Sequence, residues 1–239
     1  MASDVVDLRD FYRTPLGQVA RRVIRRAIQR VWPDLHGMRL LGLGYATPFL
    51  SALAPDTERT IAVMPALLGV LPWPADSPNR VTLAEEGELP FADYSIDRVL
   101  LVHALETSEE VRAMLKEIWR VLAGGGRVLI VAPNRRGIWA RLDLTPFGSG
   151  RPYTHSQLSQ LLRDEQFTPI GSDTALFIPP SRHGMMLRSS AAWERIGRRW
   201  FPTFAGVLLV EATKQIYAKP AAPRAPRRRL VYAPAPHGL

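Results

Sequence analysis

The chain has no cysteine among its 239 residues, and this absence excludes disulfides, thiolate metal sites and cysteine nucleophiles. Its five histidines, at positions 36, 103, 155, 183 and 237, show no spacing typical of metal ligands, so no metal site is expected. No uncharged apolar run reaches the ~18 residues that a membrane-spanning helix needs. The first residues also lack the basic start and apolar core of a signal peptide. These absences predict a cytoplasmic protein.

Two common phosphate-binding glycine motifs are missing as well. The stretch 39–48 reads as a buried strand followed by a glycine turn, but Thr47 takes the third glycine position of a dinucleotide loop, and no Gly-Lys-Ser/Thr follows. Gly42 and Gly44 allow a tight bend and a close approach of another molecule. Thr47 is predicted as a helix N-cap and Pro48 as the first helical residue. Such a helix start suits an anionic ligand group, although an ordinary strand-to-helix connection explains the same residues.

Positive charge exceeds negative charge, with 31 Lys and Arg against 22 Asp and Glu, and the excess gathers at the two ends of the chain. Residues 9–32 are predicted as one amphipathic helix, because apolar residues recur every three or four positions and arginines fill the other face. This face suits an anionic membrane or a protein partner. A surface helix with its arginines in water explains it equally well.

Strand and helix patterns then alternate along the middle of the chain. Apolar strands are expected at 39–44, 59–64, 80–84, 97–102 and 126–132, with helices starting at 48 and spanning about 108–122, and a short helix plus loop at 65–78. A helix at 153–165 and strands at 167–178 and 205–217, flanking a helix at about 188–200, complete the pattern. This order predicts an α/β, Rossmann-like, doubly wound sheet of seven mostly parallel strands with an antiparallel edge strand and helices on both faces.

Three segments are expected. Residues 1–37 form a basic amphipathic N-terminal helix packed on the domain, and residues 38–217 form the α/β domain. Residues 218–239 are rich in Pro and Arg, contain no acid and have too little apolar surface to fold alone, which predicts a flexible tail. Ligands of such a sheet bind beyond the carboxyl ends of its strands, here at 42–48, 64–65, 84–88 and 103–106.

Three ordered blocks carry a family resemblance. Leu89-Pro-Phe-Ala-Asp-Tyr-Ser-Ile-Asp-Arg-Val99, His103-Ala-Leu-Glu106 and Leu115-Lys-Glu-Ile-Trp-Arg-Val-Leu-Ala-Gly-Gly-Gly-Arg127 together resemble class I S-adenosylmethionine-dependent methyltransferases, most of all those of type 11 that modify small molecules. The similarity covers about residues 38–134. It implies the fold above and S-adenosylmethionine as cofactor, unless altered positions have abolished its binding.

The family turn after the first strand reads acidic-x-Gly-x-Gly-x-Gly, whereas this chain has Gly42, Gly44, Ala46 and Pro48 at those places. At the end of the second strand, where the family has a carboxylate that accepts both ribose hydroxyls, the chain has Met64. Each lost charge-assisted hydrogen bond costs about 1.5–3 kcal/mol. The resemblance implies the following cofactor contacts: Gly42, Gly44, Tyr45, Met64, Glu85 (adenine amine), Glu86 (adenine ring) and His103 (methionine portion).

Two functions follow from the resemblance. The first is methyl transfer to a small-molecule acceptor, with Tyr153, His155 and Asp143 as candidate acceptor contacts; this reaction needs alignment more than acid/base groups. The second is a methyltransferase-like protein that has lost catalysis and serves as a binding or regulatory subunit for another protein, docking through the arginine-rich helix or tail. A third reading, RNA binding, rests on aromatics near arginines in residues 193–201. No recognised RNA-binding module is evident, so nucleic acid is not expected.

Overall fold

The computed structural model describes residues 4–142, 145–181 and 183–215, and the predicted tail lies outside them. Its strands are β1 (Arg39–Gly44), β2 (Arg59–Pro65), β3 (Val81–Ala84), β4 (Ile96–Val102), β5 (Leu122–Pro133), β6 (Phe167–Ala175) and β7 (Val207–Lys214). Its α-helices are α1 (Val5–Arg13), α2 (Pro15–Val31), α3 (Thr47–Leu50), α4 (Val111–Val121), α5 (His155–Asp164), α6 (Gly184–Arg188) and α7 (Ser190–Trp200). Four short 3₁₀ helices are η1 (Ala54–Asp56), η2 (Trp139–Arg141), η3 (Pro146–Gly148) and η4 (Pro202–Phe204).

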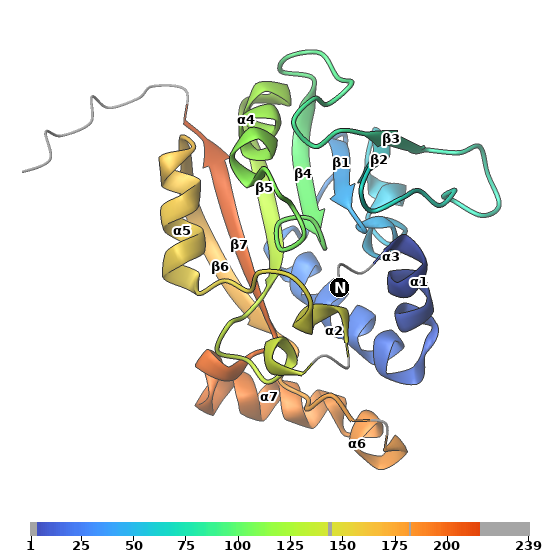
Figure 1. The fold of residues 1–239 in the computed structure, drawn as a ribbon, viewed down its shortest axis with the longest axis vertical. Coiled ribbons are helices and arrows are strands. Elements are labelled where there is room, and N and C mark those ends of the chain that lie inside the picture. The colour runs from blue at the N-terminus through green and yellow to red at the C-terminus, as the bar shows by residue number, and fades with distance from the viewer. Residues whose placement is uncertain (1–3, 143–144, 182, 216–239) are drawn as a thin grey trace, which may run out of the picture.

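The strands form one seven-stranded sheet in the order β3-β2-β1-β4-β5-β7-β6 (Figure 1). The first five strands are parallel, and β7 runs antiparallel between β5 and the edge strand β6. The predicted fold class is confirmed. Strand order reverses between β1 and β4, and this switch point is where ligands of open α/β sheets bind.

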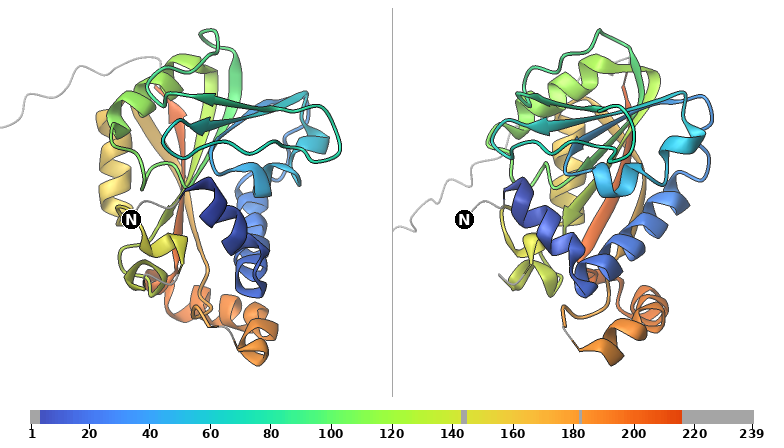
Figure 2. Two further views of the ribbon diagram at one scale, coloured as in Figure 1. Left: turned by 45° about the vertical axis from the view of Figure 1, so that its right-hand side comes forward. Right: turned by 90° about the vertical axis from the view of Figure 1, so that its right-hand side faces the viewer.

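Side chains alternate between the two faces of the central strands, and each face is covered by its own helices. Leu40, Leu100 and Leu129 pack with α1, α2 and α3, whereas Leu41 and Leu101 pack with α4 and α5 on the opposite face (Figure 2). The period of two residues sends neighbouring side chains to opposite faces. This is why the central strands are apolar throughout rather than in alternation.

The predicted single helix at 9–32 is wrong in one respect, because the structure has two helices separated at Thr14. Pro15 disfavours helical geometry in the residue before it and cannot donate a backbone hydrogen bond. Thr14 is extended, and its hydroxyl accepts from the Gly17 amide at 3.0 Å, so it caps α2. Because the helix is interrupted at Thr14, α1 runs in a different direction from α2 and lies beside the carboxyl ends of β1 and β2 (Figures 1 and 2).

Three further local predictions differ from the structure. No helix follows β2, where residues 66–68 form only a turn. Thr47 is the first residue of α3, and Ala46 is its cap without a side-chain bond. Ser108, predicted to cap the helix after β4, instead donates its hydroxyl to Glu86 Oε1 at 2.5 Å, and α4 begins at Val111. A proline-rich loop follows β2 and an acceptor on Glu86 captures Ser108, so these two contexts prevailed over local propensity.

The blocks that carry the family resemblance are held together by a polar network. Arg120, on α4, donates to the carbonyl oxygens of Leu89 at 2.9 Å and Phe91 at 2.8 Å, and it pairs with Asp93 and Glu117. Glu117 in turn accepts from the Leu89 amide at 2.9 Å. These residues therefore position the loop before β4 against α4, and their role is structural.

None of the helices in the described ranges is both long and apolar enough to cross a bilayer.

Candidate functional site

The carboxyl ends of β1 and β4 meet at the switch point of the sheet, and those of β2 and β3 follow toward its edge; α1 lies beside the ends of β1 and β2 (Figure 1). The segments that meet in this region are far apart in sequence. The helix α1 reaches it because the Val5 amide donates to the Leu68 carbonyl at 2.9 Å, which ties the start of α1 to the turn after β2.

The two glycines of the β1 turn are required by packing within the chain. Gly44 has φ of +81°, and a Cβ added there would lie 2.4 Å from the Val102 carbonyl oxygen. A Cβ at Gly42 would lie 2.5 Å from a methyl of Leu50. Both glycines are therefore explained by the contact of β1 with β4 and α3, without a ligand.

Aromatic side chains from separate segments pack together next to this turn. Tyr45 is 6% exposed, and its ring stacks on Tyr12 of α1 with centroids 5.9 Å apart. Tyr12 also meets Phe49 edge-on, and Phe147 of η3 packs on His103 at 4.9 Å. Such ring pairs stabilise beyond the apolar area they bury. The region that the resemblance assigns to the methionine part of the cofactor thus contains a packed aromatic cluster.

A buried chain of hydrogen bonds runs through the cluster. The Tyr12 hydroxyl lies 2.8 Å from His103 Nε2, and His103 Nδ1 lies 3.1 Å from Glu106 Oε1. His103 and Glu106 are each 2% exposed. From this bonding pattern we assign a neutral imidazole whose Nδ1–H donates to Glu106 and whose Nε2 accepts from the Tyr12 hydroxyl. Glu106 Oε2 has no hydrogen-bond partner among the described residues.

Burial also affects the two tyrosines. It raises the pKa of Tyr12 well above its ordinary value of 10, with the Glu106 carboxylate as the next contribution. Burial raises the pKa of Tyr45 too, while Arg9, Arg13 and Arg21 act in the opposite direction. Both hydroxyls therefore stay protonated at neutral pH and act as hydrogen-bonding groups, not as bases.

Met64 lies at the end of β2, at the position the resemblance assigns to ribose binding. Its side chain is fully buried, and its sulfur accepts from the Leu71 amide at 3.4 Å. A thioether accepts hydrogen bonds weakly and carries no charge. Met64 therefore holds the loop after β2 in place and offers nothing that would bind two hydroxyls.

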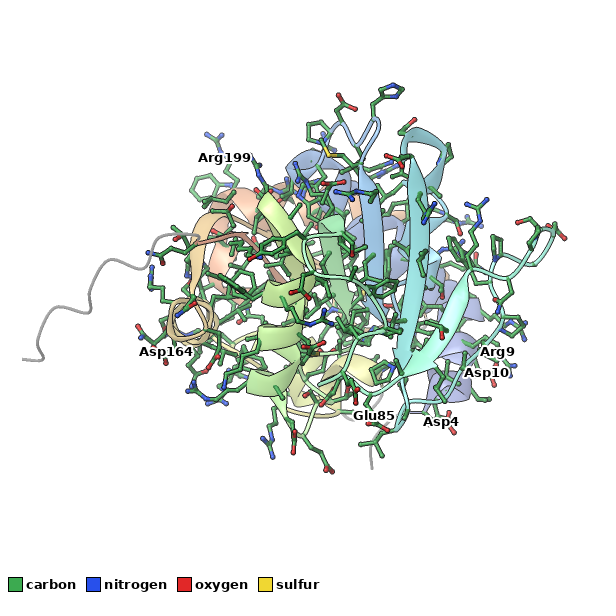
Figure 3. The ribbon with its side chains drawn as sticks, turned by 90° about the horizontal axis from the view of Figure 1, so that it is seen from above. Asp4, Arg9, Asp10, Glu85, Asp164 and Arg199 are labelled. Atoms are coloured by element: carbon green, nitrogen blue, oxygen red, sulfur yellow. The ribbon has the colours of Figure 1, made fainter. Side chains whose placement is uncertain are left out.

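Glu85 and Glu86 line a separate cleft of about 660 Å³ between the ends of β2 and β3 and the start of α4. Glu85 is exposed, whereas Glu86 Oε1 accepts from Ser108 and from the Glu110 amide. Figure 3 shows Glu85 on the opposite side of the molecule from Arg199. The cleft also holds Glu88, Glu109 and Glu110, so it favours a cationic or amine-bearing group.

The candidate acceptor contacts are divided by the fold. Tyr153 is half-buried, and burial raises its pKa, with Glu106 as the second cause. It therefore lies near the hydrogen-bonded chain. His155 is the exposed first residue of α5, after the capping-box residue Thr154, and takes no part in the site. Asp143 lies outside the described residues.

These observations together test whether S-adenosylmethionine fits. The resemblance implies an acceptor for the ribose at the end of β2 and open space above Gly44. The chain has a buried thioether at the first position and stacked Tyr12 and Tyr45 rings at the second. The residues present do not fit the cofactor in the position that the family uses.

Sequence reasoning missed Tyr12, Phe147 and the role of Glu106. Tyr12 is one aromatic in an arginine-rich helix, and its partner His103 is 91 positions away, so no local pattern connects them. Glu106 belongs to the block His103-Ala-Leu-Glu106 that carries the resemblance, but nothing in the sequence showed that its carboxylate would be buried beside His103.

Comparisons with known proteins identify the fold. Residues 67–130 match the family model described as a methyltransferase domain. The fold is similar to that of an S-adenosylmethionine-dependent methyltransferase of Thermotoga maritima, described as a possible histamine N-methyltransferase, with a TM-score of 0.63 and 18% identity over 88% of this chain and 96% of that one. The chain therefore has the fold of class I S-adenosylmethionine-dependent methyltransferases, and the predicted resemblance is confirmed.

Two further matches are informative. A chain from the complex of the Trm112 methyltransferase activator of Haloferax volcanii with a methyltransferase has a TM-score of 0.54 and 17% identity, over 78% of this chain and 86% of that one. An uncharacterised protein of Methanocaldococcus jannaschii is 29% identical over 106 residues, which are 44% of this chain. The chain matches only about half the length of this curated relative, 47%.

Proposed function

We propose that this chain is a methyltransferase-fold protein that has lost methyl transfer and acts as a binding or regulatory subunit. The observation that carries the proposal is the pair of stacked rings of Tyr12 and Tyr45 above Gly44, fixed by the bond from Tyr12 to His103. A cofactor placed as the resemblance implies would have to displace these rings. Moving α1 aside to make room exposes Leu8 and Tyr12, which are buried, and burying such side chains stabilises by about 1.5–3 kcal/mol each.

The family match is compatible with this proposal, because the matched segment contains residues that maintain the fold. Residues 67–130 include Arg120, Glu117 and Leu89, which tie α4 to the loop before β4. These contacts maintain the fold whether or not a cofactor binds. The complex of a similarly folded chain with the Trm112 activator also supports a role in which this fold binds another protein.

Methyl transfer to a small-molecule acceptor is the second candidate. It is favoured by the family match and by the open cleft beside Glu85 and Glu86, where the resemblance places adenine. It requires the ribose and methionine portions of the cofactor to bind differently from the arrangement that the resemblance implies.

Calorimetric titration with S-adenosylmethionine and S-adenosylhomocysteine separates the two candidates. We expect no binding up to about 1 mM, a limit that corresponds to a binding free energy weaker than about −4 kcal/mol. One-to-one binding tighter than about 100 µM, weakened at least tenfold by Glu85→Ala, would overturn the proposal and support the enzyme. Thr82→Ala, an exchange on β3 away from the cleft, is the matched control for that variant.

A further inference from the structure

A second cleft, of about 700 Å³, lies between α1, α2, α3 and the loop 71–75, and the function above does not use it. It shares no lining residue with the acidic cleft beside Glu85. Its volume falls in the range of about 300–1,000 Å³ that is usual for small-molecule sites. Four arginines line it, two from the α1 segment (Arg9 and Arg13) and two from α2 (Arg21 and Arg25).

The positive charge in this cleft is only partly balanced. Asp10 lies 2.9 Å from Arg9 and 3.9 Å from Arg13. Arg21 and Arg25 have no carboxylate within ion-pair distance in the part of the chain that the structure describes, and none of the described residues lining the cleft is acidic. Like charges gathered in a concave surface raise the local potential and attract anions.

The other walls supply hydrogen-bonding groups and an aromatic ring. The Tyr45 hydroxyl forms no hydrogen bond among the described residues, and its ring edge lines the cleft beside Thr47. Trp73 is half-buried, and its indole donates to Ser51 Oγ at 3.0 Å, which fixes the ring against α3. An immobilised ring at the rim of a basic cleft suits a ligand whose anionic end is joined to a flat organic group.

We propose that this cleft binds a small molecule carrying at least two phosphate groups. Guanidinium groups bind phosphate oxygens in bidentate pairs, and four of them exceed what one carboxylate or a single phosphate requires. The inference goes beyond the proposed function, which does not depend on this cleft, and it names a ligand class. A solvated arginine face is the competing explanation, but Arg22 and Arg26 provide such a face on the same helix, outside the cleft.

The test is calorimetric titration of the full chain with inorganic pyrophosphate at low salt. Arg21→Gln/Arg25→Gln is expected to weaken binding at least about tenfold, because it removes two guanidinium groups and their charge-assisted hydrogen bonds to phosphate. Arg22→Gln/Arg26→Gln removes the same charge from the same helix and is expected to change affinity by less than twofold. Both pairs are exposed, so circular dichroism should show unchanged folding.

Adenosine diphosphate and adenosine extend the test to the organic part of the ligand. The diphosphate is expected to bind at least as tightly as pyrophosphate, and adenosine alone is expected not to bind. Absence of pyrophosphate binding, equal weakening by the two double variants, or binding of single-stranded RNA that pyrophosphate does not displace would each overturn the inference. If neither pyrophosphate nor S-adenosylmethionine binds, the inference fails and the proposed function stands. If both bind, the proposed function fails and the inference stands.

Discussion

Tyr12 links the N-terminal helix α1 to the core of the sheet domain. Its hydroxyl reaches His103 from an N-terminal helix, and its ring covers Tyr45. His103 is then held between Tyr12 and a buried carboxylate, Glu106. A histidine that the resemblance places beside the cofactor has become part of the connection between α1 and the domain.

The first residue-scale prediction concerns this bond. Tyr12→Phe is expected to lower the free energy of unfolding by about 1–3 kcal/mol, because it leaves a buried imidazole nitrogen without its partner. Urea denaturation measures the change. Tyr94→Phe is the matched control, since Tyr94 is 56% exposed and should give a change within about 0.5 kcal/mol. An equal effect of both variants would contradict the role given to the Tyr12 hydroxyl.

Asp97 gives a second prediction, in pH dependence. Its carboxylate accepts from Arg39 Nε at 2.8 Å and from the Arg39 amide at 2.9 Å, and the hydrogen bond to the Arg39 side chain is the main cause that lowers its pKa from 3.8. A lowered folded-state pKa gives stability that is present above the unfolded value and is lost as pH falls through the folded one.

Wild type is therefore expected to be more stable than Asp97→Asn at pH 7, with the difference shrinking as pH falls below about 4. Urea denaturation at several pH values between 7 and 3 measures it. A difference that stays constant over this range would show that the charge of Asp97 contributes nothing to stability.

At the scale of the element, the β1 turn shows how a motif can survive for a structural reason. Gly44 is the first glycine of the family pattern, and the contact between β1 and β4 requires it. Ala46 and Pro48 replace the other two glycines. Pro48 fits the first turn of α3, where a missing N–H costs nothing. The turn thus keeps the glycine that packing requires, although two glycines of the family pattern are replaced.

Gly44→Ala and Gly37→Ala form a matched pair at this scale. Both glycines have positive φ, but an added Cβ meets nothing within 4 Å at Gly37 and lies 2.4 Å from a carbonyl oxygen at Gly44. Gly37→Ala is expected to cost about 1–2 kcal/mol from the left-handed backbone alone. Gly44→Ala should cost about 2–4 kcal/mol because overpacking adds to it, as thermal or urea unfolding would show. Equal costs would contradict the packing explanation.

At the scale of the whole molecule, charge is separated between two clefts. The cleft beside α1 and α2 has four arginines, and the cleft at the ends of β2 and β3 has five glutamates. The net charge of +9 does not show this division, because it sums over both. Electrostatic attraction of ligands depends on where charges converge, so the two clefts present opposite local potentials.

The sequence by itself determined the seven strands in their chain order and the class of fold. These predictions use local signals. An apolar run such as 97–102 predicts a buried strand, and a capping residue such as Thr154 predicts where a helix begins. The departures from the family pattern at Met64, Ala46 and Pro48 were also visible without coordinates. The break at Thr14 was missed because the helical periodicity continues on both sides of it.

Only the tertiary structure decided what occupies the switch point of the sheet. Tyr12, Tyr45, His103 and Phe147 come from four separate segments, and their rings meet only after the sheet has formed and α1 has turned across it. The same holds for Arg9 and Arg25, which share a cleft because two helices meet at an angle. Local sequence encodes the direction of each side chain within its element, whereas the space between elements depends on how all of them pack.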